Sequence, residues 1–317
     1  MLFYIVRRVV YVIPIALAVS LVCFLLVHIA PGDPIDAMVQ PDTPQEVIDR
    51  VRSEYGLDRP LPVQFGLWLA KLVQGDFGTS LIKGRPVLPD LVSASGATFV
   101  LACTGGLLGV LAGCILGGIA GVYRESWLDR VLLGTAVAGV SVPHYWLGMV
   151  MVIIFSVNLN LLPAMGSGPG GSTAWAWDWA HLRYLILPSV TLAVIPAGIV
   201  TRTVRGLVSD IISQDYITTL RGKGLRRAGI VRHVVLNAAP TVLAVVGLQL
   251  ANLMGGSILV ETVFAWPGTG MMLNTAIFQR DLPVLQATTL LLALFFVVLN
   301  LVVDLIQTAI DPRISRR

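Results

Sequence analysis

DYITTLRGKGLRRAGIVRHVVLNAAP, residues 215–240, is a basic segment between two long apolar runs. Its positive side chains lie within a dozen residues: Arg221, Lys223, Arg226, Arg227 and Arg232. Such a cluster is typical of the cytoplasmic side of a membrane protein. Gly222 and Gly224 flank Lys223 and can adopt the left-handed backbone that ends a short helix. The segment therefore predicts a stiff helix-turn-helix loop that docks on another protein.

The composition indicates a membrane protein. Hydrophobic residues make up 56% of the chain, charged residues make up 13%, and the mean hydropathy is +0.81, whereas roughly a quarter of the residues of a soluble domain are charged. The net charge of +4 and the pI near 9.1 could suggest nucleic-acid binding. The basic residues, however, occur in blocks beside apolar spans and do not form one broad face, so we expect no nucleic-acid partner.

Six apolar runs are long enough to cross a bilayer, since a transmembrane helix needs roughly 17 to 25 residues. The fold class predicted is an all-α membrane protein with these spans at residues 9–30, 99–123, 131–157, 184–206, 241–260 and 284–310. The first run is longer than the apolar core of a signal peptide, about 7 to 15 residues, and is interpreted as an uncleaved span. Pro143, Pro196 and Pro240 lie within or beside spans and predict kinks.

The basic residues also set the orientation. An even number of spans puts both termini on one side, and the Lys and Arg bias assigns that side to the cytoplasm. The opposite short loops offer only Arg183 and Arg280. The cytoplasmic side is expected to hold the loop at 207–240 together with Arg7, Arg8, Arg124, Arg130, Arg202, Arg205, Arg313, Arg316 and Arg317.

The segment 31–98 is expected to lie outside as a small folded subdomain, because a stretch of that length crosses largely regardless of its charge. Turn signals at 31–34 and 41–44 precede an amphipathic helix predicted at 45–55, with Thr43 as its cap. The predicted organisation is residues 1–30 for the N-terminus and first span, 31–98 for the external subdomain, 99–310 for a five-helix core that includes the loop 207–240, and 311–317 for a cytoplasmic tail.

The second predicted span carries a glycine every four residues. Positions four apart share one helix face, so this face is a flat ridge on which another helix can approach closely. The interpretation favoured is tight helix packing, and the alternative is a surface that slides during gating. The glycines are Gly105, Gly109, Gly113, Gly117 and Gly121.

Several polar and aromatic residues within or beside the spans each allow two interpretations. Asp304 is expected to pair with Arg202 or Arg205, with a gating role as the alternative. For His28 and His144 a packing role is favoured over substrate contact. The tryptophans before the fourth span favour an interfacial belt over a substrate-stacking platform; they are Trp175, Trp177 and Trp179.

The sequence shows no catalytic or metal-binding pattern. Cys23, Cys103 and Cys114 all fall in predicted spans without ligand-like spacing, which argues against disulfides and metal sites. The one Gly-Lys pair is followed by Gly224, where a phosphate-binding loop needs Ser or Thr. We therefore expect a chain that is not an enzyme and binds no cofactor. An ion-coupled secondary carrier remains an alternative, although it should show inverted repeats or buried ionisable relays.

Seven different stretches, spread along the whole chain, are informative when they are taken together. They are the opening IVRRVVYVIPIALAVSLVCFLLVHIAPGDP, then YGLDRPLPVQF, GDFGTSL, SVPHYWLG, SQDYITTLRGKGL, ETVFAWPGTG and the final DPRI. Together they resemble the permease subunits of ABC importers of the dipeptide, oligopeptide and nickel type, and in particular the B-type subunit of dipeptide permeases. The resemblance implies a type I importer architecture in the bacterial inner membrane, with an external insertion after the first helix and a cytoplasmic coupling helix between the fourth and the fifth.

The resemblance also implies a docking loop that fits a groove of an ATPase subunit. Its family pattern is Glu-Ala-Ala, three residues, Gly, nine residues, then Ile-x-Leu-Pro. Gly224 takes the glycine position, whereas Thr218, Leu220 and Asn237 depart from the pattern. The residues expected to form the coupling segment are Asp215, Tyr216, Thr218, Thr219, Leu220, Arg221, Gly222, Lys223, Gly224 and Leu225.

The partners implied by the resemblance are a sister permease, two ABC ATPase subunits that bind ATP and Mg, and an external solute-binding protein. The permease would form half of a translocation path with alternating access, for the import of dipeptides or oligopeptides. Nickel chelates, glutathione and other small solutes are the alternative cargoes that the resemblance allows.

Overall fold

The computed structural model describes residues 2–29, 44–46, 49, 53, 58–171 and 175–310, with the backbone alone at 2–9, 26–29, 254, 256, 304 and 307–310. Most of the helix predicted at 45–55, its cap Thr43, the turns at 31–34 and 41–43, and the tail 311–317 lie outside these residues. Within them the regular secondary structure is helical, apart from an antiparallel bridge between Thr79 and Pro86, and turns or irregular segments connect the helices.

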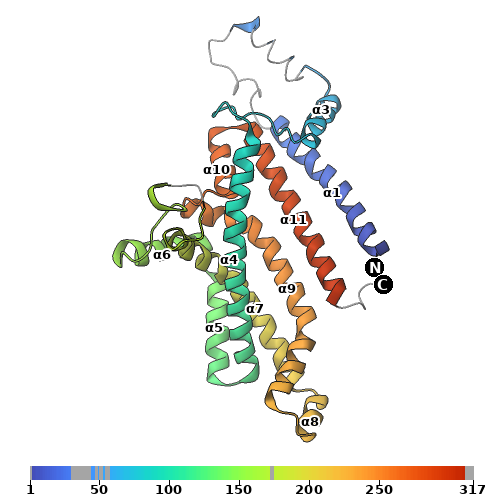
Figure 1. The fold of residues 1–317 in the computed structure, drawn as a ribbon, viewed down its shortest axis with the longest axis vertical. Helices are drawn as coiled ribbons and strands as arrows, with labels where there is room; N and C mark the ends of the chain where they lie inside the picture. The colour runs from blue at the N-terminus through green and yellow to red at the C-terminus, as the bar shows by residue number, and fades with distance from the viewer. Residues whose placement is uncertain are drawn as a thin grey trace.

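The helices run mostly along the long axis of the molecule (Figure 1). α3 and α10 lie at one end, called here the α10 end, and α8 lies at the other, the α8 end. The elements are α1 (Leu2–Ile29), α3 (Leu61–Val73), α4 (Val87–Val122), α5 (Trp127–Ser141), α6 (His144–Met151), the π-helix η2 (Val152–Asn158), the short η3 (Pro169–Gly171), α7 (Trp179–Ile212), α8 (Asp215–Gly222), α9 (Arg227–Val263), α10 (Thr269–Gln279) and α11 (Leu282–Ile310).

Four of the described helices are long and apolar enough to cross a membrane: α4, α7, Arg227–Leu253 of α9 and Leu282–Val303 of α11. A fifth candidate is the pair of α5 with α6 and η2, which passes the same test only as a broken span. The apolar part of α1 that can be assessed is shorter, Val10–Leu25, so the six predicted spans are not all reproduced by length and composition.

The third predicted span differs from the structure. Residues 131–157 were expected to form one helix, but the chain breaks at Val142 and Pro143, and the two parts meet at a bend of 101°. Val142 has an extended backbone (φ −87°, ψ 126°), as expected for a residue before proline. Pro143 supplies no amide hydrogen to continue the helix, so it precedes the new helix α6.

The second span also differs, because α4 begins at Val87 and not at residue 99. Pro86 precedes the helix, and Asp90 lies in its first turn, where a carboxylate interacts favourably with the helix dipole. Val87 and Leu91 are buried against Ala287 and other apolar side chains of α10 and α11. This packing extends the helix beyond the apolar stretch that the sequence marks.

The glycine ridge of α4 lies against α7. A Cβ added at Gly113 would lie 2.6 Å from the Cβ of Val200, and one added at Gly117 would lie 2.5 Å from the carbonyl oxygen of Thr201. Comparable distances to α7 apply to the other three, Gly105 (3.1 Å), Gly109 (2.7 Å) and Gly121 (2.7 Å). The two backbones are therefore close enough that no side chain fits between them at these positions.

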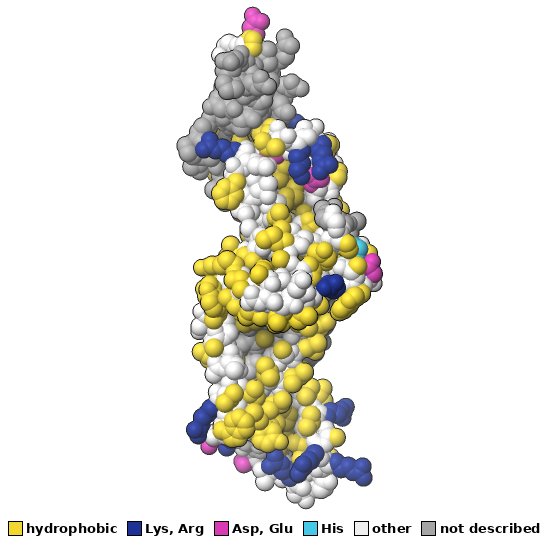
Figure 2. Space-filling model, turned by 90° about the vertical axis from the view of Figure 1, so that its left-hand side faces the viewer, with side chains coloured by type: hydrophobic (Ala, Val, Ile, Leu, Met, Phe, Trp, Pro, Cys, Tyr) yellow, Lys and Arg dark blue, Asp and Glu magenta, His cyan; other side chains and the backbone are white. Residues whose placement is uncertain are grey.

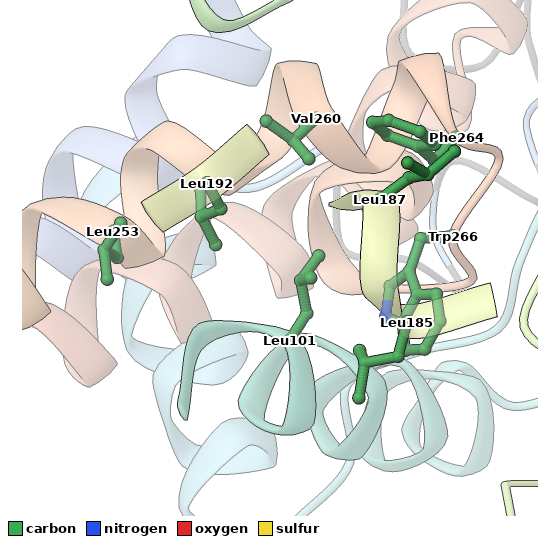
Figure 3. Close-up of a cluster of buried hydrophobic side chains, with 8 residues drawn as sticks. All are labelled: Leu101, Leu185, Leu187, Leu192, Leu253, Val260, Phe264 and Trp266. Carbon is green, nitrogen blue, oxygen red and sulfur yellow. The ribbon is translucent and has the colours of Figure 1, made fainter. Parts of the chain in front are cut away.

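The largest buried apolar cluster joins α4, α7, α9 and the turn that follows α9 (Figure 3). Phe264 and Trp266, from this turn, are almost completely buried. Trp175 packs edge-on against Trp266, with ring centroids 5.4 Å apart. The other two tryptophans predicted for an interfacial belt, Trp177 and Trp179, are 70% and 68% exposed. Trp175 is partly buried and thus packs against the edge of the core.

Candidate functional site

α8 is a short helix held at the end of the bundle between α7 and α9 (Figure 1). Ile217 is completely buried in a cluster that includes Ile211 of α7 and Val234 of α9. Tyr216 and Leu220 are partly buried against the same cluster. Residues three and four apart share a helix face, so these side chains form one apolar side that anchors α8 to the bundle.

The end of α8 depends on Gly224. This residue has a φ of +77°, and its amide donates to the carbonyl of Arg221 at 2.9 Å while the amide of Leu225 donates to the carbonyl of Leu220 at 3.1 Å. These two bonds form a Schellman motif, in which glycine is favoured because the left-handed backbone crowds a Cβ. A Cβ at Gly224 would meet no atom within 4 Å, so only the backbone conformation requires glycine.

The opposite face of α8 and the turn after it are exposed and positively charged. Figure 2 shows Lys and Arg side chains gathered at this end of the molecule, below a broad apolar surface. Of the predicted coupling residues, Tyr216 and Leu220 are partly buried. The exposed ones are Asp215, Thr218, Thr219, Arg221, Gly222, Lys223, Gly224 and Leu225.

Two residues outside that predicted set hold the segment in place. Ile217 is not among the predicted residues, although it lies three residues before Leu220, the spacing of one helix face, and this spacing is the signal that could have identified it. Asn237, which departs from the family's proline, donates from Nδ2 to the hydroxyl of Tyr216 at 3.2 Å and to the carbonyl of His233 at 2.8 Å. An asparagine at this position thus links α8 directly to α9.

An ion pair between the buried carboxylate of Asp129, in the first turn of α5, and the partly buried guanidinium of Arg205 joins α5 to α7. Nε of Arg205 donates to Oδ1 of Asp129 at 3.1 Å, and Nη2 donates to Oδ2 at 2.6 Å. The amide of Glu125 also donates to Asp129 Oδ2 at 2.9 Å. Arg205 thus pairs with Asp129. The pairing predicted between Asp304 and Arg202 or Arg205 stays a prediction, because the side chain of Asp304 lies outside the described part of the chain.

Comparison with known families decides which class of protein carries this segment. The family model of the binding-protein-dependent transport system inner membrane component matches residues 109–316. The chain belongs to this family. A second model, for the N-terminal part of binding-protein-dependent transport system membrane components, matches residues 1–88.

The permease is similar over its whole length to the glutathione transport system permease protein GsiC. The identity is 41% over 315 residues to the protein from Salmonella typhi and 40% over 315 residues to that from Escherichia coli strain K12, covering 99% of both chains in each case. The fold is similar to a chain of the MetNI methionine ABC transporter in an inward-facing conformation, with a TM-score of 0.57 and 19% identity over 70% of this chain and 96% of that chain.

These similarities confirm the resemblance found in the sequence. The chain is a permease subunit of an ABC importer in the dipeptide, oligopeptide and nickel family, with the all-helical fold of type I importers. It is a multi-pass protein of the inner membrane, it is not catalytic, and the family carries no cofactor in this subunit. ATPase subunits and a solute-binding protein are its partners, so the alternative of a secondary carrier does not apply.

Proposed function

We propose that this permease forms half of the translocation path of an importer for small peptides, and that α8 is its coupling helix. The observation that carries the proposal is the construction of α8: one face is anchored in the bundle by Ile217, and the other is exposed and basic. A helix with an anchored face and a free face can receive a partner and pass its displacement to the helices behind it. The free face requires acidic or polar groups in the receiving ATPase groove.

The connection from α8 into the bundle is short and stiff. The Schellman turn at Gly224 leads within a few residues to α9, which begins at Arg227. The contacts of Ile217 with α7 and α9 leave little freedom for α8 to move alone. When the two ATPase subunits close on ATP and Mg, the displacement of α8 would therefore be delivered to α7 and α9.

The cargo proposed is a small peptide. Support comes from the whole-length similarity to permeases named for glutathione transport, because glutathione is itself a tripeptide. Dipeptides and short oligopeptides share its peptide bonds and charged ends, whereas nickel chelates remain the alternative with different chemistry. In this proposal a sister permease supplies the other half of the path.

The orientation proposed puts the α8 end and both termini in the cytoplasm. The exposed Arg and Lys residues at the α8 end support this assignment. The opposite end, with the described residues 58–98 and the turn 264–268, would then receive the solute-binding protein.

The test is purification of the permease from its native membrane in mild detergent, with identification of the co-purifying subunits and assay of ATP hydrolysis. Gly224→Val should lose the ATPase subunits but remain inserted, because a β-branched residue in a left-handed conformation costs more than the roughly 1 to 2 kcal/mol of an ordinary side chain. Gly118→Val is the matched control, since Gly118 is helical, lies outside the coupling segment, and its added Cβ meets no atom within 4 Å.

Reconstituted vesicles then separate the cargoes. We expect uptake of labelled dipeptide or glutathione that unlabelled peptides inhibit and nickel chelates do not. Transport by a wild-type complex that contains no ATPase, or normal ATPase binding by Gly224→Val, would refute the coupling role. Competition by nickel chelates alone would refute the peptide cargo.

A further inference from the structure

Glu261, in the last turn of α9, is completely buried and makes hydrogen bonds to α4 and α10. Its Oε2 accepts from the amide of Gly270 at 2.7 Å and from the amide of Met271 at 3.2 Å, both in the first turn of α10. Its Oε1 accepts from the hydroxyl of Thr98 on α4 at 2.8 Å. Ser257, one turn earlier on α9, also bonds to this carboxyl group.

Thr98 connects the same three helices from the α4 side. Its hydroxyl oxygen accepts from the amide of Thr269 at 2.8 Å and lies 2.9 Å from the hydroxyl of Thr269. One residue before it, the carbonyl of Ala97 accepts from Nε1 of Trp266 at 2.9 Å. We call this set of residues, Ala97, Thr98, Glu261, Trp266 and 268–271, the α10 clamp.

The α10 clamp is packed so tightly that its two glycines have no space for a side chain. A Cβ added at Gly270 would lie 2.5 Å from the Cα of Ile258 and 2.9 Å from Glu261 Oε2. One added at Gly268 would lie 2.5 Å from the hydroxyl of Thr98. The glycines of the PGTG stretch are therefore required by the close approach of the backbone to the carboxyl group.

The chemistry of the α10 clamp suits a carboxylate. An ionised carboxylate only accepts hydrogen bonds, and the described partners of Glu261 are hydroxyls and backbone amides that can donate to it. The two amides belong to the N-terminus of α10, where unpaired amides and the helix dipole stabilise a negative group. A glutamine offers one acceptor oxygen in place of two and therefore cannot satisfy the same donors.

We propose that Glu261 is a positioning residue for transport, because the α10 clamp makes the last turn of α9, the start of α10 and the adjoining part of α4 move as one body. This inference rests on the coupling role proposed for α8. From Arg227 to Val263, α9 runs about 55 Å from the α8 end to the α10 clamp (Figure 1). A displacement of α8 thus reaches the far face of the permease as a tilt of the clamped helices, and not as a slip of α9 along α4.

The proposal is tested on the assembled transporter with Glu261→Gln and Thr98→Val. Thr98→Val keeps the size of the side chain and the charge of Glu261, so it decides the test if Glu261→Gln does not assemble. Thr275→Val is the matched control, since the hydroxyl of Thr275 is exposed and bonds only to the carbonyl of Met271 in its own helix among the described contacts.

The first measurement is the distance between spin labels at two exposed positions, Val92 on α4 and Phe278 on α10. The native residues Cys23, Cys103 and Cys114 are changed to alanine for this purpose. We expect one narrow distance in the wild type that is the same with and without ATP, and a broadened distribution in Thr98→Val. A wild-type distance that changes when ATP binds would refute the α10 clamp.

The second measurement is ATP hydrolysis stimulated by the solute-binding protein, relative to basal hydrolysis. Both clamp variants should keep basal hydrolysis, but the stimulation should fall about tenfold, the factor expected from losing a hydrogen bond to a buried charged group. Stimulation equal to that of Thr275→Val would refute the positioning role. If no ATPase co-purifies with the wild type, the coupling function fails, while the label distance in the isolated permease still tests the clamp.

Discussion

Replacing Gly117 with alanine tests how closely α4 approaches α7. The added Cβ would lie 2.5 Å from the carbonyl oxygen of Thr201, which is about 0.9 Å closer than the ordinary contact of 3.4 Å. A backbone carbonyl cannot rotate away as a side chain does, so the helices must separate. Overpacking of this kind costs roughly 1 to 3 kcal/mol.

Gly118 provides the matched control in the same turn of α4, because its added Cβ meets no atom within 4 Å. Both substitutions gain the same helix propensity, about 0.5 to 1 kcal/mol, so their difference isolates the packing cost. At roughly 2 to 4 °C per kcal/mol, thermal unfolding of Gly117→Ala should begin about 2 to 12 °C below that of Gly118→Ala.

The assay is tryptophan fluorescence of the purified permease during heating in one detergent, which the seven tryptophans make possible. Gly106→Ala should fall between the two variants, because its nearest contact at 2.6 Å is Cδ2 of Leu250, the movable end of a side chain. Equal melting temperatures for Gly117→Ala and Gly118→Ala would show that the two helices do not touch as described.

Two further substitutions test the α8 end. Ile217→Ala should destabilise the packing of α8 by about 2 to 4 kcal/mol and weaken ATPase binding in pull-down assays. Ile115→Ala makes the same change at a position of α4 that is 60% exposed, and it should change neither. Equal ATPase binding by both variants would show that the anchor is unimportant. Arg205→Met leaves the buried carboxylate of Asp129 unpaired and should cost about 3 kcal/mol, measured by thermal unfolding, and the addition of Asp129→Asn should recover part of that loss. A single variant as stable as the wild type would contradict the ion pair.

Features set by local spacing could be predicted from the sequence. The glycine ridge is an example, because residues four apart share a face whatever the helix packs against. The turn at Gly224 is another, since few residues other than glycine adopt a left-handed backbone. The third predicted span, 131–157, shows what local spacing and composition cannot predict. The run is apolar, but apolar composition does not reveal how far the backbone bends. Pro143 was expected to produce a kink, and the structure shows a bend of 101° there.

Contacts between distant parts of the chain could not be predicted. Asp129 and Arg205 are 76 residues apart, and Thr98 and Glu261 are 163 residues apart. Both pairs depend on how α4, α7 and α9 pack, which one sequence does not specify. From charge alone, the sequence predicts Arg202 or Arg205 as the partner of Asp304 and does not reveal that Arg205 pairs with Asp129. The spacing of Ile217 and Leu220 indicates a shared helix face, but the burial of Ile217 between α7 and α9 depends on the same packing.

The break between α5 and α6 limits what can surround that side of the permease. α5 is 15 residues long and so rises about 22 Å, less than the roughly 30 Å of a hydrocarbon core. The last carbonyls of α5 and the first amides of α6 therefore come at membrane depth without partners inside their own helices. Acyl chains cannot satisfy such groups. In the complete transporter this side must face protein or water, so the lipid annulus is interrupted there.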